Sequence, residues 1–140
     1  VRIGHRTATV ANVHFVLSSP IGQAGRIGLR RYVEDAVEVR MAQARALLGA
    51  ARGRKGPLVV CGDFNTPPRD MVHAMLAEAW TDAAGSVGSG FGYTVPSPMP
   101  LLRIDYVWLS RELRAVRTSV PAVTDSDHRP VIADIATTEP

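Results

Sequence analysis

The chain has 140 residues, of which 46% are hydrophobic and 21% are charged, and these values are ordinary for one soluble globular domain. They exclude intrinsic disorder, collagen-like repeats and a membrane bundle, while the single cysteine excludes an internal disulfide and a cysteine-rich metal site. The formal net charge of +3 is only a weak indication of a phosphate-bearing partner.

The first half of the chain predicts a strand, a helix and a second strand. The segment 7–17 is rich in Val, Thr and Ala and predicts a strand ending near His14, followed by a Ser-, Pro- and Gly-rich loop over 18–26. Apolar residues then recur at helical spacing over 29–51, which predicts a long amphipathic helix. The apolar run from Leu58 to Cys61 is typical of a strand buried on both faces.

The second half predicts a short helix and further strands. Asp70 is typical of an N-cap, so a helix is expected from Met71 to about Trp80. The Gly-, Ser- and Pro-rich segment 82–100 predicts a long irregular loop, and loops of that length are uncommon unless they are functional. Further strands are expected over 104–109, 115–120 and 131–135. This order of elements predicts the α/β (α+β) class with a central sheet.

Polar side chains of the kind that carry chemistry stand at or beside the ends of the predicted strands. In open α/β sheets, ligands bind beyond the strand ends, so four distant segments are expected to bring these side chains together. The set comprises His14, Asp63, Asn65, Asp105, Asp127 and His128.

The spacing of Asp63 and Asn65 leaves two interpretations open. In an extended segment both side chains project to one side, where a carboxylate that activates water would stand beside an amide that donates to a phosphate oxygen. The alternative is an Asx turn that leads into Thr66 and two prolines.

The other charged positions also have alternatives. Asp127 beside His128 has two interpretations. Asp127 would bind a hard cation while His128 donates to a phosphoryl oxygen, or both residues belong to a solvated turn. Asp105 lies in an apolar strand, where a carboxylate is costly unless it is paired. A histidine partner would remove that cost, and the alternatives are a pair with Arg103 or an outward orientation. His14 is either a catalytic group or a core histidine.

Four short motifs follow one another in a specific order. They are Asn12-Val13-His14, Gly62-Asp63-Phe64-Asn65, Arg103-Ile104-Asp105-Tyr106 and Ser126-Asp127-His128-Arg129-Pro130. In this order they resemble the C-terminal half of the endonuclease/exonuclease/phosphatase superfamily, and the resemblance extends from about Thr7 to Ile135. One motif departs from the family, because its usual Thr-His-Leu is Val-His-Phe here.

The resemblance implies part of a four-layered α/β/β/α sandwich and a phosphoesterase that depends on Mg²⁺ or Mn²⁺. Asp63 would activate the attacking water, and Asn65 would help to position the water or the phosphate. His128, held by Asp105, would stabilise the transition state, and His14 would contact the scissile phosphate.

The remaining assignments from the resemblance concern the metal and the substrate. The metal ligands would be Asp127, Asp63 and Asn65, and the further substrate ligands would be Asn12 and Arg103. The substrate would be a phosphate ester: a nucleic acid, a phospholipid headgroup or a small phosphate. The motifs do not choose among these three, and a non-catalytic phosphate-binding pseudoenzyme is the alternative from another functional class.

The resemblance also implies that residues 1–140 are a single partial domain. The family's N-terminal half carries another Asn and the Glu that is the principal metal ligand, and it has no counterpart before Val1. We therefore expect an apolar, uncovered inner face on the sheet, little turnover by the chain alone, and activity in the intact parent.

The missing N-terminal half is the expected partner, and no other stable protein partner is expected. The segment 90–110 resembles bacterial members of the superfamily that are often membrane-anchored or exported. Any signal or anchor would lie upstream, so the compartment stays open between the cytoplasm and a membrane-anchored or exported location.

Overall fold

The computed structural model describes residues 1–3, 6–16, 28–123 and 125–138, and the loop expected over 18–26 lies outside them. The helices of the described part are α2 (Leu29–Ala51), α3 (Met71–Ala77) and α4 (Ala83–Val87). Its strands are β1 (Arg2–Ile3), β2 (Arg6–Thr7), β3 (Thr9–His14), β4 (Leu58–Asp63), β5 (Thr81–Asp82), β6 (Asp105–Leu109), β7 (Leu113–Ser119) and β8 (Ile132–Thr137).

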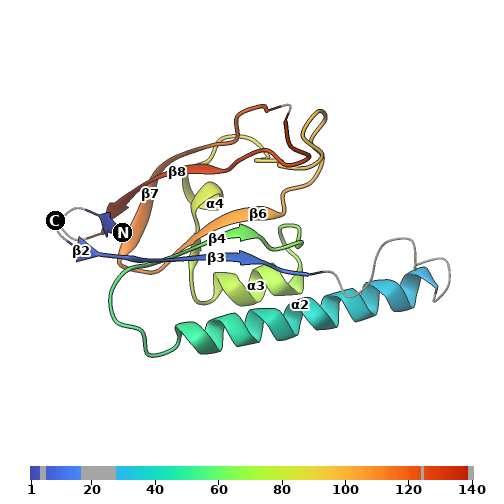
Figure 1. Cartoon of the computed structure of the whole chain (residues 1–140), viewed down its shortest axis with the longest axis horizontal. Coiled ribbons are helices and arrows are strands. Elements are labelled where there is room, and N and C mark those ends of the chain that lie inside the picture. Colours follow the sequence, from blue (N-terminus) through green and yellow to red (C-terminus); the bar gives the residue numbers. More distant parts are fainter. Residues whose placement is uncertain (4–5, 17–27, 124, 139–140) are drawn as a thin grey trace.

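The elements are stacked in layers (Figure 1). Helices α2 and α3 cover one face of a four-stranded sheet of order β3-β4-β6-β5, in which β3 and β4 are parallel and the other pairs are antiparallel. The antiparallel pair β7–β8 lies over the opposite face. This arrangement confirms the predicted α/β class with a central sheet. None of the described helices is both long and apolar enough to cross a membrane.

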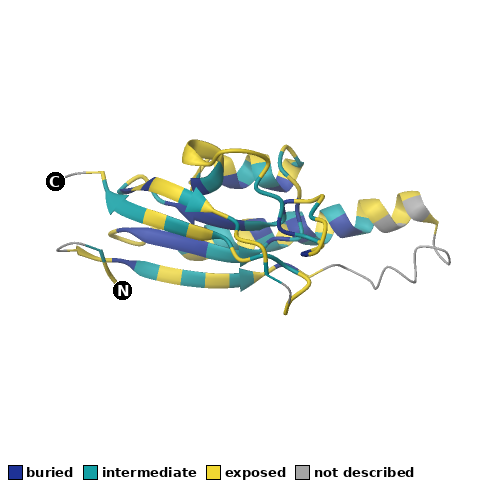
Figure 2. Cartoon of the chain, turned by 90° about the horizontal axis from the view of Figure 1, so that it is seen from above, coloured by how far each residue is buried: buried dark blue, intermediate teal, exposed yellow. Residues whose placement is uncertain are grey.

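Strand β3 shows how the sequence sorts residues between the two faces of the sheet. Ala11 and Val13 are half-buried toward the helices, whereas Val10, Asn12 and His14 are exposed on the opposite face. Figure 2 shows this alternation along the strand that begins near the N-terminus. Because successive side chains of a strand point to opposite faces, the polar motif residues share the face that is turned away from the helices.

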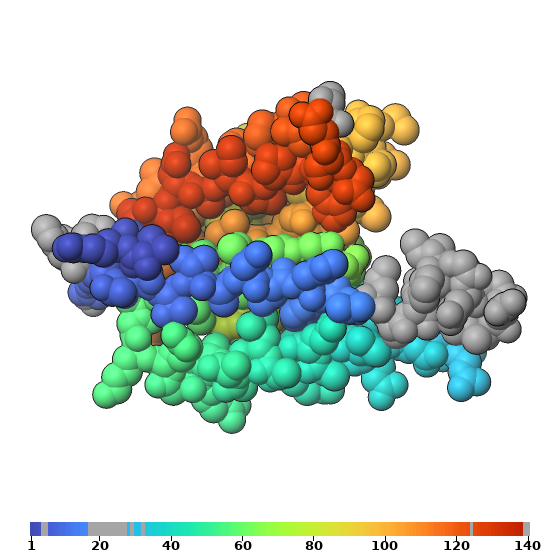
Figure 3. Space-filling model, viewed as in Figure 1, coloured from blue at the N-terminus to red at the C-terminus, as the bar shows by residue number. Residues whose placement is uncertain are grey.

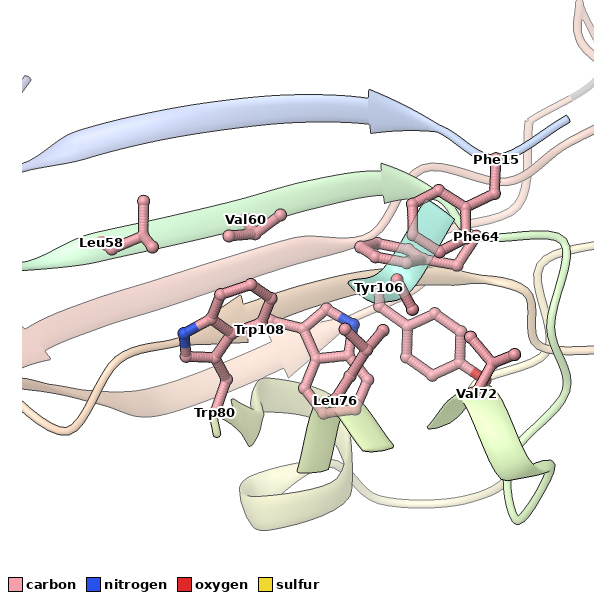
Figure 4. Packing of buried hydrophobic residues seen from close by; sticks show 10 residues of the cluster. Phe15, Leu58, Val60, Phe64, Val72, Leu76, Trp80, Tyr106 and Trp108 are labelled. Carbon is pink, nitrogen blue, oxygen red and sulfur yellow. The ribbon is translucent and has the colours of Figure 1, made fainter. Parts of the chain in front are cut away.

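An aromatic cluster fills the space between the sheet and α3 (Figure 4). The Phe64 ring lies 4.9 Å from Phe15 and 5.8 Å, edge-on, from Tyr106, and these tilted and edge-on contacts are favourable arrangements for aromatic pairs. Leu76 of α3 closes the cluster from below and is almost fully buried. This core fixes the backbone of Phe64, which stands between Asp63 and Asn65.

The predicted boundaries are correct to within a few residues for α2, β4, β6, β7 and β8. Asp70 caps α3 as predicted, since its carboxylate accepts a hydrogen bond from the Val72 backbone nitrogen, but the helix ends at Ala77. The prediction of one irregular loop over 82–100 is wrong in its first part, which forms α4. Its fully buried Ala83 contributes to the core, while the surrounding Gly and Ser residues concealed the helix in the sequence.

The inner face of the sheet is also less open than expected. Val59, Val107 and Leu109 are buried against Leu113 and other apolar residues beneath β7 and β8, so the prediction of an uncovered apolar face is wrong there. Toward β3 the face is open, and Val10 is 45% exposed.

Gly62 provides a test of how tightly β3 and β4 approach each other. Its φ is 135°, and a Cβ atom at this position would lie 1.9 Å from the Val13 carbonyl oxygen. We predict that Gly62→Ala lowers the free energy of unfolding by about 3 kcal/mol, because the clash and the backbone strain add. Urea denaturation measures this change.

Gly49→Ala is the matched control, because a Cβ atom there meets no atom within 4 Å. It is expected to raise the stability by up to about 1 kcal/mol, as alanine favours a helix over glycine. A Gly62→Ala protein as stable as the wild type would contradict the close approach.

Candidate active site

Two strand pairings bring three polar side chains to the same end of the sheet. Asp63 at the end of β4 is the register partner of His14 on β3 and of Asp105 at the start of β6. The Nε2 atom of His14 lies 3.7 Å from Oδ2 of Asp63, and the His14 side chain is 72% exposed. The sequence separates these residues widely, and the sheet register places them in one row.

His128 joins this row from the loop that precedes β8. Its Nδ1 atom lies 2.9 Å from Oδ2 of Asp105, and both side chains are mostly buried. Burial alone would lower the pKa of His128, but the hydrogen bond and the negative charge of Asp105 raise it above the ordinary histidine value. The partner of Asp105 is therefore the histidine and not Arg103, which resolves one open alternative.

The backbone between Asp63 and Asn65 forms a tight turn. Oδ1 of Asp63 accepts a 2.7 Å hydrogen bond from the Asn65 backbone nitrogen, and Asn65 has a φ of 48°. The Asn65 side-chain nitrogen donates to the Phe15 carbonyl at 2.7 Å and to Oδ2 of Asp63 at 3.2 Å. The Asx turn is thus present, and the side chains of Asp63 and Asn65 also lie on the same side of the backbone. Since the Asn65 side-chain nitrogen is engaged, its amide oxygen is the atom that could bind a ligand.

The environment of Asp63 favours its neutral form more than water does. Burial is the main cause of its raised pKa, and the negative charge of Asp105 adds to it. The hydrogen bond from the Asn65 backbone and the positive charges of His128 and His14 act in the opposite direction. A carboxylate with a raised pKa is a better proton acceptor near neutral pH.

A cavity of about 620 Å³ lies beside these groups on the inner face of the sheet. Asn12, Asp105 and His128 contribute to its lining, as do Cys61 and Arg129. Burial raises the pKa of the Cys61 thiol, which keeps it neutral and agrees with its interpretation as a small apolar residue.

Two residues assigned from the sequence lie apart from this cluster. Arg103 is buried, its Nη1 atom lies 2.7 Å from Oδ2 of Asp82, and its guanidinium lies over the Tyr106 ring. It does not line the cavity of about 620 Å³, and its guanidinium forms an ion pair with Asp82, while the expected substrate contact stays a prediction. Asp127 is exposed and lies outside the group of close ligand atoms. The sequence did not reveal the Arg103 pair, because Asp82 becomes its neighbour only through β5–β6 pairing.

Sequence analysis missed the residues that hold the His128 loop in place. Thr94 and Ser97 are fully buried. The Ser97 nitrogen donates to the Asp127 carbonyl, and the Arg129 nitrogen donates to the Thr94 carbonyl, both at 2.7 Å. The Arg129 side chain also donates to the Ser97 carbonyl, and the Ser97 hydroxyl donates to the Val123 carbonyl. The only available signal was the unusual length of the segment 82–100.

The chain is similar to known proteins in sequence and in fold. The model of the Endonuclease/Exonuclease/phosphatase family matches residues 3–128. Human nocturnin is 28% identical over an alignment of 119 residues, and the match covers 66% of this chain and 27% of nocturnin.

Solved structures share the fold. A functionally unknown conserved protein from Enterococcus faecalis has a TM-score of 0.71 at 21% identity, over 91% of this chain and 49% of that one. A mannosyl-6-phosphatase of Bacteroides thetaiotaomicron has a TM-score of 0.64 at 18% identity, over 89% and 49%. The chain thus spans no more than about half the length of these proteins. Because the family match extends over most of its residues, the chain belongs to the endonuclease/exonuclease/phosphatase family.

Proposed function

We propose that the intact protein containing this chain hydrolyses a phosphate ester bond with the help of a divalent metal ion, Mg²⁺ or Mn²⁺. The observation that carries this proposal is the convergence of Asp63, Asp105 and His128, whose ligand atoms all lie within 4.8 Å of one another. The family is one of nucleases and phosphatases, and a structurally similar protein is a mannosyl-6-phosphatase. These relatives support hydrolysis of a phosphate ester as the class of reaction, and we propose a nucleic acid, a phospholipid headgroup or a small phosphate as the substrate.

The donor set suits a hard cation. Asp63 and Asp105 are register partners, and the charge of Asp105 contributes to the raised pKa of Asp63, so a cation between them would relieve their repulsion. Carboxylate and amide oxygens are the ligands that Mg²⁺ and Mn²⁺ prefer. We assign Asp63, Asp105 and the Asn65 amide oxygen to this ion, with Asp127 as a further candidate from the exposed loop.

The ion, Asp63 and His128 would then have separate roles in the reaction. The bound ion would polarise a phosphoryl oxygen. Asp63 would accept the proton of the attacking water, because its carboxylate stands beside His128 and Asn65 in the same row of side chains. His128 has its Nδ1 engaged by Asp105, so its Nε2 is the atom that would donate to a phosphoryl oxygen as negative charge develops there.

His14 and Asn12 would contact the substrate at the mouth of the cavity. Asn12 lines the cavity, and the exposed imidazole of His14 is close to Asp63 without being buried in the core. This placement favours the catalytic interpretation of His14 over that of a core histidine.

We also propose that efficient turnover needs polypeptide beyond these residues. The cluster is open toward β3, where Val10 and His14 are exposed, and catalysis by metal and aimed donors needs a site from which water is largely excluded. The related chains are about twice as long. The chain alone is therefore expected to bind metal weakly and to show little turnover.

The role of Asp63 is tested in the intact parent protein. We predict that Asp63→Asn lowers Mg²⁺-dependent hydrolysis at least about a hundredfold, because proton acceptance and a metal ligand are lost together. Plasmid DNA, phospholipid vesicles and inositol phosphates serve as substrates, and product release is measured.

Asp134→Asn is the control, because this exposed carboxylate on β8 pairs only with the exposed Arg117 among the contacts seen here. It is expected to leave the rate unchanged. Full activity of Asp63→Asn would contradict the assigned role, and retained phosphate binding without any turnover by the wild type would favour the pseudoenzyme alternative.

The His128–Asp105 pair predicts a pH dependence in the metal-free protein. Since folding raises the pKa of His128 above its ordinary 6.5, the pair's contribution to stability is fully present below pH 6.5 and is lost as the pH rises through the folded pKa. NMR titration of His128 should give a pKa above 6.5 in the wild type and a lower value in Asp105→Asn. Equal values in the two proteins would refute the pairing.

A further inference from the structure

The hydroxyl of Tyr106 joins the two segments that carry the candidate metal ligands. It donates to the Thr66 carbonyl at 2.8 Å and to the Arg103 carbonyl at 3.0 Å. Thr66 follows Asn65, and Arg103 stands two residues before Asp105. A hydroxyl has one proton, so the two carbonyl oxygens share it in a three-centre hydrogen bond. One atom therefore holds the two chain segments together.

This hydrogen bond lies beyond the point where β4 and β6 stop pairing. β4 ends at Asp63, whose register partner is Asp105, the first residue of β6. Figure 3 shows β4 in green and β6 in orange side by side on one face of the molecule. Asn65 and Thr66 come after this last pair, so strand pairing does not set their position. The Tyr106 hydroxyl gives their turn an attachment to the segment that leads into β6.

The core holds the ring of Tyr106 in a fixed place. The residue is 2% exposed, its ring is stacked on Trp108 with centroids 5.5 Å apart, and the Phe64 ring meets it edge-on. The guanidinium of Arg103 lies over the ring, 4.8 Å from its centroid. Figure 4 shows the ring within this cluster. Because a ring packed on several sides does not turn freely, its hydroxyl is a defined attachment point.

The Tyr106 side chain lies on the face of the sheet opposite to the metal ligands. Successive residues of a strand point to opposite faces, so Asp105 lines the cavity while the Tyr106 ring belongs to the core cluster against α3. The hydroxyl is therefore not a ligand of the ion. It acts on the ligands through the backbone, at the residue after Asn65 and at the residue two before Asp105.

We propose that Tyr106 is a positioning residue for the metal site, because its hydroxyl fixes the turn of Asn65 against the segment that leads into Asp105. This role rests on the proposed function, in which Asp63, Asp105 and the Asn65 amide oxygen hold a divalent ion. Ligands must be held to within about 0.5 Å of the geometry that binds the ion. Groups that orient the ligands without touching the metal therefore change its affinity strongly.

The test uses the intact parent protein and the variant Tyr106→Phe, which keeps the packed ring and removes only the hydroxyl oxygen. The Kd for Mn²⁺ is measured from the electron paramagnetic resonance signal of the free ion. We predict that this Kd rises about tenfold or more, because the turn is released from the segment that leads into β6. Excess Mn²⁺ should restore part of the lost hydrolysis rate. Circular dichroism and urea denaturation check that the variant is folded.

Two controls separate positioning from a general loss of stability. Tyr93→Phe removes the same atom from a half-buried tyrosine whose hydroxyl makes no hydrogen bond to the described residues. Leu113→Val removes a buried methylene at the start of β7, in the apolar cluster beneath β7 and β8, and lowers the urea midpoint without touching either segment. Both variants are expected to keep the Mn²⁺ Kd of the wild type.

An unchanged Mn²⁺ Kd in Tyr106→Phe, or an equal rise in Leu113→Val, would overturn the positioning role. No Mn²⁺ binding by the wild type would refute this role together with the proposed function. Mn²⁺ binding that Tyr106→Phe weakens, in a protein that hydrolyses none of the phosphate esters tried, would refute the proposed function and leave the positioning role standing.

Discussion

The antiparallel pairing of β4 with β6 is the constraint on which the site depends. It places Asp63 opposite Asp105, two carboxylates that repel each other and that would not stay together in an unfolded chain. Burial of Phe64 in the aromatic core and the close approach of Gly62 to the Val13 carbonyl hold this register. Apolar packing on the helix face of the sheet thus maintains a charged arrangement on the other face.

A second constraint acts on the loop that carries His128. Loops that lack buried apolar contacts are mobile by default, and a catalytic imidazole needs a defined position. Here Asp105 fixes one ring nitrogen, while the buried Thr94 and Ser97 fix the backbone on either side of His128. The segment 91–102 therefore contributes to the site geometry through its buried polar residues.

The sequence predicted the helices and strands well where periodicity was strong, as in α2 and β4. The motif order predicted that Asp105 and His128 meet near Asp63 and His14, but Arg103 and Asp127 lie apart from them. The sequence did not predict three features of the structure. The burial of Arg103 depends on β5 pairing with β6, which brings Asp82 within reach. Helix α4 is rich in Gly and Ser, so tertiary contacts at Ala83 override its weak propensity. The hydrogen bonds at Ser97 all end on backbone carbonyl oxygens, which leave no side-chain pattern in a sequence.

The central claim is that Asp63 and Asp105 share one divalent ion beside His128. Anomalous X-ray scattering from crystals of the intact protein grown with Mn²⁺ tests it most directly. The account predicts a manganese peak about 2 Å from oxygens of both carboxylates, since that is the distance at which hard divalent ions bind carboxylates. A peak bound elsewhere, with Asp63 and Asp105 both free of metal, would contradict it.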